Sequence, residues 1–427
     1  MHRTSNGESG VQQSIESEQR LTSPDGGPSP RLPLLIAALS TLAPFFIDTY
    51  LPSFGELGAR LHASPLQVQQ TLTAYLVPFA AMNLWHGALS DAMGRRRVVI
   101  GSLVVLLIAS VGAALATSIE ALMGFRVIQG AASGVGLVVG RAMVRDVYEG
   151  AQAQRVMAQV SALFAIAPAV APVIGGWLHE LFGWRSVFGF LAILSTLLLV
   201  WSHLGLPETL PAAQRHPLHL GRLLRSYLET MTDGAFLAAA GAATFNFLGV
   251  FLYISSAPRF LLEHLQLRET QFLWLFGPMT AGMMLGAAAS GHLAGRLSPM
   301  RTLGAGYLLM LGAAAANGLF HALHGAAVPW SVLPIAVYSF GMALSMPTLT
   351  LLSLDLHPTR KGLASSCQAF LLTTGNAVTA GVLAPLLNTT PLRLAIGQLS
   401  LALVGLGFLG IFLHLSRRPT SRHPATV

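Results

Sequence analysis

Long apolar stretches separated by short polar breaks occupy most of the chain. About 20 apolar residues are enough for an α-helix to cross the roughly 30 Å of hydrocarbon in a bilayer. Twelve stretches of this kind can be delimited, at 33–54, 68–90, 98–116, 121–143, 155–179, 185–205, 234–258, 271–294, 301–322, 328–353, 362–387 and 392–414. The pattern predicts an all-α membrane protein with twelve transmembrane helices.

A longer polar segment, 207–233, separates the sixth stretch from the seventh. This spacing predicts an N-terminal six-helix half at 33–206, a cytoplasmic linker at 207–233 and a C-terminal six-helix half at 234–415. Duplicated six-helix halves are the architecture of one class of secondary transporters, in which the substrate site lies at the interface between the halves.

The two predicted halves share weak sequence similarity at corresponding positions. Leu89 after the second stretch is repeated as Leu293 after the eighth, 204 positions later, and Pro52 is repeated as Pro258 at an offset of 206. The nearly equal offsets favour an internal duplication over chance.

The two ends of the chain are polar. Residues 1–32 are rich in Ser, Gln, Glu, Gly and Pro, and they contain too little apolar surface to offset their chain entropy. We expect this segment to be a disordered cytoplasmic tail, because it is too long and too acidic for a signal peptide. Residues 416–427 are expected to form a second, short cytoplasmic tail.

Composition removes the soluble classes of protein. The chain has 427 residues, of which 53% are hydrophobic and 10% are Asp, Glu, Lys or Arg, whereas a soluble domain has roughly 25% charged residues. The net charge of +8 would ordinarily suggest nucleic-acid binding. Here the basic residues form short clusters between apolar runs, so no nucleic-acid partner is expected.

The basic residues instead indicate an orientation in the membrane. Nineteen of the 25 Lys and Arg residues lie on one side of the predicted spans, five lie on the other, and Arg126 lies inside a helix. The richer side is the cytoplasmic one. The sequence therefore predicts a multi-pass protein of the cell inner membrane with both termini in the cytoplasm, surrounded by membrane lipids.

The loop after the second stretch has an ordered pattern of glycines and charges, Gly87-x-Leu89-Ser90-Asp91-x-x-Gly94-Arg95-Arg96-Arg97. Gly94 permits a tight turn. Asp91 can pair with an arginine of the turn and accept backbone N–H groups, and Asp146 is a second candidate partner for Arg95. The alternative is an ordinary positive-inside loop, which rarely supplies these residues in this order.

The fourth stretch contains Arg126 and, three residues later, Gln129. An arginine in the centre of a transmembrane helix costs about 2.5–3.5 kcal/mol on insertion scales, so it usually faces the bundle interior and has a function. The alternative is an arginine near the helix end that extends to the membrane surface. The spacing of these residues does not distinguish an arginine that faces the bundle interior from one that extends to the membrane surface.

The fifth stretch carries Pro168, Pro172, Gly175 and Gly176. Prolines four residues apart remove backbone hydrogen bonds, and glycines permit close helix contact. The pattern predicts a tightly packed, bendable helix, and a merely kinked helix is the alternative.

Asp48 is the one carboxylate well inside the membrane region of the first half. Desolvation disfavours its charged form, which would allow it to take up and release a proton. The alternative is a hydrated acid near the outer mouth, since Pro52 follows four residues later.

These motifs resemble those of the major facilitator superfamily. The loop is similar to its signature Gly-x-Leu-Ala-Asp-Arg-x-Gly-Arg-Lys/Arg, with Ala92 and Ser90 as departures, and the Arg126 segment is similar to its helix-four motif. The proline segment resembles its antiporter motif, with Ala167 and Ala171 replacing two glycines. The stretch Phe46–Pro52, the end of helix four and the segment Tyr253–Pro258 are similar to the bicyclomycin-resistance (Bcr/CflA) drug exporters.

The resemblance implies the twelve-helix major facilitator fold and a function. It implies that Gly87, Asp91, Gly94, Arg95, Arg96 and Asp146 gate the inward-facing and outward-facing states. It also implies that Arg126 with Gln129 assists proton transfer, that the antiporter-motif helix marks an exporter, and that Asp48 binds drug and proton.

We therefore expect proton-coupled export of amphipathic drugs or other small molecules by alternating access, by a monomer that uses no cofactor. Two alternatives remain open, a dedicated exporter of one endogenous metabolite and a polytopic membrane sensor. An enzyme is not expected, because no cluster of nucleophile, base or metal ligands is visible. The pairs His216/His219 and His321/His324 have no further ligand candidates nearby in sequence, so no metal site is predicted.

Overall fold

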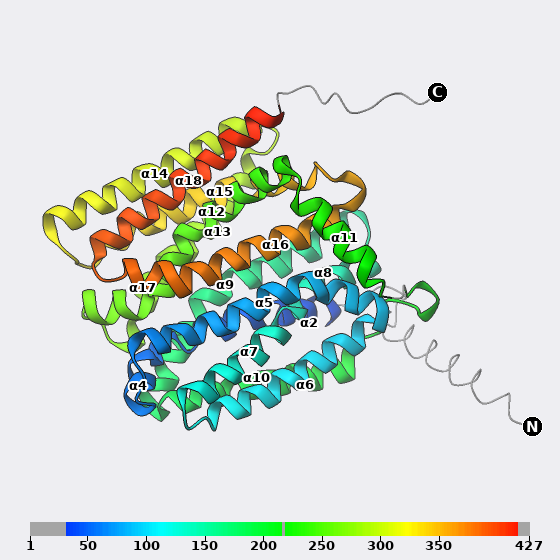
Figure 1. Ribbon diagram of the computed structural model, residues 1–427, viewed down its shortest axis with the longest axis horizontal. Coiled ribbons are helices and arrows are strands. Elements are labelled where there is room, and N and C mark those ends of the chain that lie inside the picture. The colour runs from blue at the N-terminus through cyan, green and yellow to red at the C-terminus, as the bar shows by residue number, and fades with distance from the viewer. Residues whose placement is uncertain (1–30, 216–217, 417–427) are drawn as a thin grey trace, which may run out of the picture. The chain divides into compact units, whose positions relative to one another are not determined.

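The computed structural model describes residues 31–215 and 218–416, and they form two compact units, Met1–Leu218 and His219–Val427 (Figure 1). The predicted N-terminal tail, 1–32, lies outside the described residues except for Arg31 and Leu32. These two residues begin the first described helix. The predicted C-terminal tail also lies outside the described residues except for Ser416, the last helical residue.

The described residues are almost entirely helical, with one isolated β-bridge between Ala294 and Leu297. Eleven helical stretches in this part of the chain are long and apolar enough to cross a membrane, and each coincides with a predicted span. The remaining predicted span, 68–90, lies within α5 (Pro65–Met93), which is 29 residues long. Its buried Gln69, Asn83 and His86 lower its apolar content. The predicted all-α membrane fold is confirmed, and twelve spans are consistent with it.

The first unit contains six long helical stretches. They are α2 (Arg31–Ser40) with α3 (Leu42–Asp48), the 3₁₀ turn η1 (Leu51–Ser53) and α4 (Phe54–Arg60); α5; α6 (Arg95–Ala114); α7 (Ile119–Ser133) with α8 (Val135–Val147); α9 (Gly150–Phe182); and α10 (Trp184–Gly205). Within this unit α6 packs against α7 and α10, and α9 packs against the first stretch.

Local sequence explains where several of these helices begin. Ser64 and Gln67 form a reciprocal capping box at the start of α5, with Pro65 in the first turn. Ser118 accepts the backbone N–H of Ala121 at the start of α7. These caps satisfy N–H groups that would otherwise lack a partner at the helix ends.

The first stretch is broken directly after Asp48, where α3 ends. Pro52 has no N–H to donate to the carbonyl of Asp48, four residues earlier, so the regular α-helical hydrogen bonding is interrupted at this point. The chain forms the 3₁₀ turn η1 instead and then resumes as α4. The proline thus places the Asp48 carboxylate at a helix irregularity.

The second unit also contains six long stretches, preceded by α11 (Leu220–Met231). They are α12 (Gly234–Pro258) with the π-helical η3 (Arg259–His264); η4 (Glu269–Gln271) with α13 (Leu273–Leu293); α14 (Pro299–His324); α15 (Leu333–Leu354); η5 (Pro358–Arg360) with α16 (Lys361–Val378), η6 (Thr379–Leu383) and α17 (Ala384–Leu387); and α18 (Pro391–Ser416). Within it α12 packs against α15, α16 and α18.

The polar segment between the two halves contains a helix that its sequence pattern does not predict. Besides the short η2 turn (Ala212–Gln214), residues Leu220–Met231 form α11. Tyr227 and Thr230 of α11 are buried, and α11 contacts α16. Glu229 of α11 pairs with Arg360 at 3.1 Å and with Arg225 at 3.1 Å.

The Glu229 cluster gives a pH-dependent prediction. Hydrogen bonds from Arg360 and Arg225 hold the pKa of the Glu229 carboxyl below its ordinary value of 4.5. Because the pKa of Glu229 is lowered in the folded state, the cluster stabilises the fold at pH values above the ordinary pKa of 4.5. This stabilisation is lost as the pH falls through the lowered pKa. We expect hydrogen exchange of the α11 amides, corrected for intrinsic rates, to accelerate modestly in that acidic range, since the pair is exposed. A Glu229→Gln protein with the same acid-induced acceleration would contradict this account.

Candidate functional site

The centre of the first unit contains the buried guanidinium of Arg126, which has 0% exposure. Its Nη1 donates to the backbone carbonyl of Phe46 at 2.9 Å and to Oε1 of Gln129 at 2.9 Å. Gln129 is also fully buried and donates in turn to Ser110 Oγ at 3.1 Å. Arg126 is therefore enclosed by the bundle, and the alternative that it extends to the membrane surface is wrong.

Two tyrosine rings enclose the same guanidinium. Its carbon lies 4.3 Å from the ring centroid of Tyr50 and 4.4 Å from that of Tyr75. Each cation–π contact contributes on the order of 0.5–2 kcal/mol, more when the cation is desolvated. The tyrosine hydroxyls are hydrogen-bonded to Thr71 at 3.3 Å and to Ser133 at 2.6 Å. The rings and carbonyls thus compensate for much of the lost hydration of the arginine.

Asp48 lies in the same region with 3% exposure, so it is not a hydrated acid at an open mouth. Its Oδ1 is buried and has no hydrogen-bond partner among the described residues. The same holds for Nη2 of Arg126. The ion pairs of the described chain do not include one between Asp48 and Arg126 at 4.0 Å or less. A buried carboxylate without a hydrogen-bond donor is costly when charged.

Asp48 and Arg126 are mechanically connected through the backbone. The carbonyl that accepts from Arg126 belongs to Phe46, two residues before Asp48 on α3. A change of charge on Asp48 that moves α3 would therefore alter the hydrogen bonding of Arg126. The hydrogen bond to Phe46 thus ties the position of α3 to that of the Arg126 guanidinium.

The helix with the two prolines supports the same segment. α9 is a single helix, Gly150–Phe182, with Pro168 and Pro172 inside it. Gly175 packs directly on the Thr49 carbonyl, which a Cβ at this position would overlap. Gly176 is buried beside it. The glycine thus allows α9 to approach the residue that follows Asp48.

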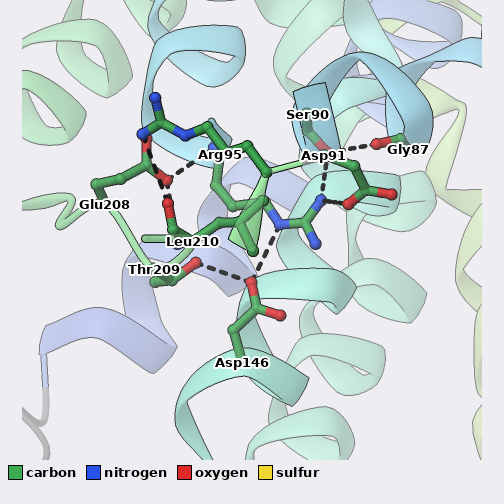
Figure 2. A network of polar contacts seen from close by, with 9 residues as sticks. Gly87, Ser90, Asp91, Arg95, Asp146, Glu208, Thr209 and Leu210 are labelled. Atoms are coloured by element: carbon green, nitrogen blue, oxygen red, sulfur yellow. Dashed lines mark hydrogen bonds and ion pairs between the residues drawn. The ribbon is translucent and has the colours of Figure 1, made fainter. Parts of the chain in front are cut away.

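The charged loop forms a second polar cluster in this unit, at the junction of α5 and α6 (Figure 2). Arg95 pairs with Asp91 and, through Nε, with Asp146 at 3.0 Å. Its Nη1 donates to Ser90 Oγ at 2.6 Å, and Ser90 donates to the carbonyl of Gly87 at 2.8 Å. Both predicted carboxylate partners of Arg95 are therefore present. Nearby, Arg96 donates to the carbonyl of His203 at 2.8 Å.

Glu208 completes this cluster and was not identified from the sequence. Its Oε1 accepts the backbone N–H of Arg95 at 2.8 Å and that of Leu210 at 3.2 Å, and its Oε2 lies 3.5 Å from Arg215. Glu208, rather than Asp91, thus accepts the N–H at the start of α6. It lies against Gly94, whose φ of 101° favours glycine and where a Cβ would overlap the carboxylate. Thr209 adds a 3.0 Å hydrogen bond to Asp146.

We expect a Glu208→Ala substitution to loosen the start of α6. Losing the acceptor of a helix-terminal N–H costs about 0.5–2 kcal/mol, and the variant also loses the partner of Arg215. Hydrogen exchange of the first α6 amides should accelerate and the melting temperature should fall. Glu149→Ala is the matched control, because Glu149 precedes α9 and makes no capping hydrogen bond. Equal effects of the two substitutions would contradict the role of Glu208.

No metal or cofactor site is assigned. Within residues 31–215 and 218–416, no three His, Cys, Asp or Glu side chains come together in a metal-binding arrangement.

Comparisons with known proteins agree on one family. The sequence model of the Major Facilitator Superfamily matches residues 34–385. The chain is 31% identical over 356 residues to an uncharacterized MFS-type transporter, YdgK, of Bacillus subtilis, which covers 82% of this chain and 88% of that protein. It is 32% identical over 228 residues to a bicyclomycin resistance protein homolog of Haemophilus influenzae, covering 52% of this chain and 56% of that protein.

A solved structure shares the fold. The crystal structure of a D-xylose-proton symporter superposes with a TM-score of 0.69 at 14% identity, over 90% of this chain and 97% of that one.

Proposed function

Because the chain belongs to the Major Facilitator Superfamily, whose members are membrane transporters and not enzymes, we propose that it exports amphipathic drugs or other small organic molecules in exchange for protons. The resistance protein homolog among its relatives supports a drug as substrate. The proton is then the coupling ion, and no cofactor is required.

The observation that carries this proposal is the Asp48 carboxylate, buried and lacking a partner for Oδ1, in the same bundle interior as the Arg126 guanidinium. Protonation from outside would neutralise Asp48 and favour one state of the transporter. Loss of the proton to the cytoplasm, together with substrate binding, would favour the other. Coupling requires that proton and substrate each bind the two states with different affinity.

The Arg95 cluster would control the exchange between these states. Arg95 joins α6 to Asp91 at the end of α5 and to Asp146 at the end of α8, and Glu208 joins the following segment to the same turn. Breaking and re-forming these contacts is a discrete, two-state change of the kind that alternating access needs.

The basic residues support a location for the transporter. We propose the cell inner membrane with both termini in the cytoplasm, in accordance with the sidedness of the Lys and Arg residues. We further propose that the chain acts as a monomer among membrane lipids, with a small-molecule substrate and no nucleic-acid partner.

The test is expression in a bacterium that lacks its major efflux pumps, followed by accumulation assays with a broad panel of compounds, with and without a protonophore. We expect reduced accumulation of several amphipathic compounds and its reversal by the protonophore. Reduced accumulation of a single endogenous metabolite would favour the dedicated exporter instead. No change for any compound would contradict the export function.

A further inference from the structure

The helix α11 leaves an apolar stripe uncovered. Tyr227 and Thr230 face the second unit and are buried, whereas Leu220, Leu224 and Leu228 are 56%, 48% and 65% exposed. These three leucines are spaced four residues apart and therefore lie along one side of the helix, next to the docked side. Exposing such a stripe to water is unfavourable by roughly 25 cal/mol for each Å² of apolar surface.

The position of α11 places this stripe at the level of the membrane surface. α11 ends at Met231, and the membrane-spanning α12 begins at Gly234, capped by Asp233. Figure 1 shows α11 running across the direction of α16, which is itself part of a membrane-spanning stretch. An amphipathic helix that crosses the direction of the transmembrane helices and connects directly to one of them is of the kind that lies in the interface between hydrocarbon and water.

The charges of α11 match an anionic surface. Arg222 and Arg225 are exposed and lie on the side of the helix away from Tyr227. The one acidic residue of α11, Glu229, is already paired with Arg225 and with Arg360 of η5. The exposed surface of the helix thus combines an apolar stripe with an excess of arginines, a combination that binds the headgroup region of anionic membranes.

We propose that α11 binds anionic phospholipid: Leu220, Leu224 and Leu228 enter the boundary between headgroups and acyl chains, and Arg222 and Arg225 bind lipid phosphate. A second copy of the chain is a poorer fit, because a stable protein interface uses about 20–30 residues on each side, whereas the stripe has three leucines. Lipid binding would hold the first turn of α12 at the membrane surface.

The depth of the stripe can be measured directly. Cys367 is the sole cysteine of the chain, so Cys367→Ser provides a background in which Leu220→Cys, Leu224→Cys or Leu228→Cys can carry an environment-sensitive fluorophore. The labelled full-length protein is reconstituted into phosphatidylcholine vesicles with and without phosphatidylglycerol, with and without brominated acyl chains. Glu229→Cys is the matched control on the same helix, because Glu229 is exposed on the side away from the leucines and is not assigned to lipid.

In vesicles that contain phosphatidylglycerol, we expect blue-shifted emission and strong quenching by brominated chains at 220, 224 and 228, and neither at 229. Emission that is blue-shifted but not quenched would place the stripe against protein and overturn the proposal. Unshifted emission would place the stripe in water and would also overturn the proposal. These readouts do not depend on transport activity.

The phosphate contact has its own test. In the Leu224→Cys protein, quenching should be stronger with phosphatidylglycerol than in pure phosphatidylcholine, and the additional Arg222→Gln and Arg225→Gln substitutions should abolish that difference. Identical quenching in the two lipids would show that the stripe does not require anionic lipid and would overturn the headgroup assignment.

Discussion

Asp48→Asn is expected to abolish export driven by a pH gradient while leaving the protein folded and able to bind substrate. Asn has nearly the same shape, but it cannot take up or release a proton, so the states can no longer be biased by the gradient. Loss of a coupling free energy of 1–3 kcal/mol, which corresponds to roughly 5- to 150-fold in affinity, removes the effect of the gradient, so we expect gradient-driven transport in proteoliposomes to fall to the level of protein-free vesicles. Exchange of labelled for unlabelled substrate without a gradient should persist.

Asp355→Asn is the control for this experiment. Asp355 is an exposed acid paired with Lys361 at 3.1 Å, far in sequence from the buried cluster of the first unit. The Asp355→Asn protein should transport at the rate of the unsubstituted protein. If Asp48→Asn also lost substrate exchange and thermal stability, its effect would be structural, and Asp48 would not be assigned to coupling.

Arg126→Lys is expected to inactivate the transporter and to lower its stability, although the charge is kept. The guanidinium stacks between Tyr50 and Tyr75 while Nη1 reaches the Phe46 carbonyl and Gln129. An ammonium group is not planar and cannot make these contacts together. A buried acceptor left without its donor costs about 1–3 kcal/mol, so the melting temperature should fall by several degrees and transport should be lost.

A matched substitution separates this effect from a general intolerance of arginine replacement. Arg185 also lies over an aromatic ring, that of Trp184 at 4.4 Å, and donates to a backbone carbonyl, that of Ala116 at 3.1 Å. It is exposed at the start of α10. Arg185→Lys should change stability and transport little. Equal losses in both variants would contradict a special role for Arg126.

The contact between Asp91 and Arg95 could be predicted from sequence because it is local. Asp91 and Arg95 are four residues apart, and opposite charges held near a tight turn have few other partners. The membrane spans could be predicted for a similar reason, since hydrocarbon demands long apolar helices whatever their tertiary packing. α5 was found by the same argument even though buried polar residues reduce its apolar content.

The remaining features depend on contacts between residues distant in the chain. Nothing in the local sequence indicates that Tyr50 and Tyr75 would face Arg126, because aromatic residues in transmembrane helices also face lipid. Glu208 lies 113 residues from the backbone N–H that it accepts. In the sequence it is an acidic residue of a polar segment, with no local feature that indicates this contact. α11 had a detectable signal, leucines repeated every four residues, which the overall polarity of its segment obscured.

The most direct test of the proton-coupled mechanism is to measure proton movement and substrate movement together. Purified protein is reconstituted into vesicles with an internal pH-sensitive dye, and a compound identified in the accumulation assay is added under an imposed pH gradient. We expect the compound to accelerate collapse of the gradient with the unsubstituted protein and not with Asp48→Asn. Substrate transport without any proton movement, or equal collapse with Asp48→Asn, would contradict the assignment of Asp48 as the coupling carboxylate.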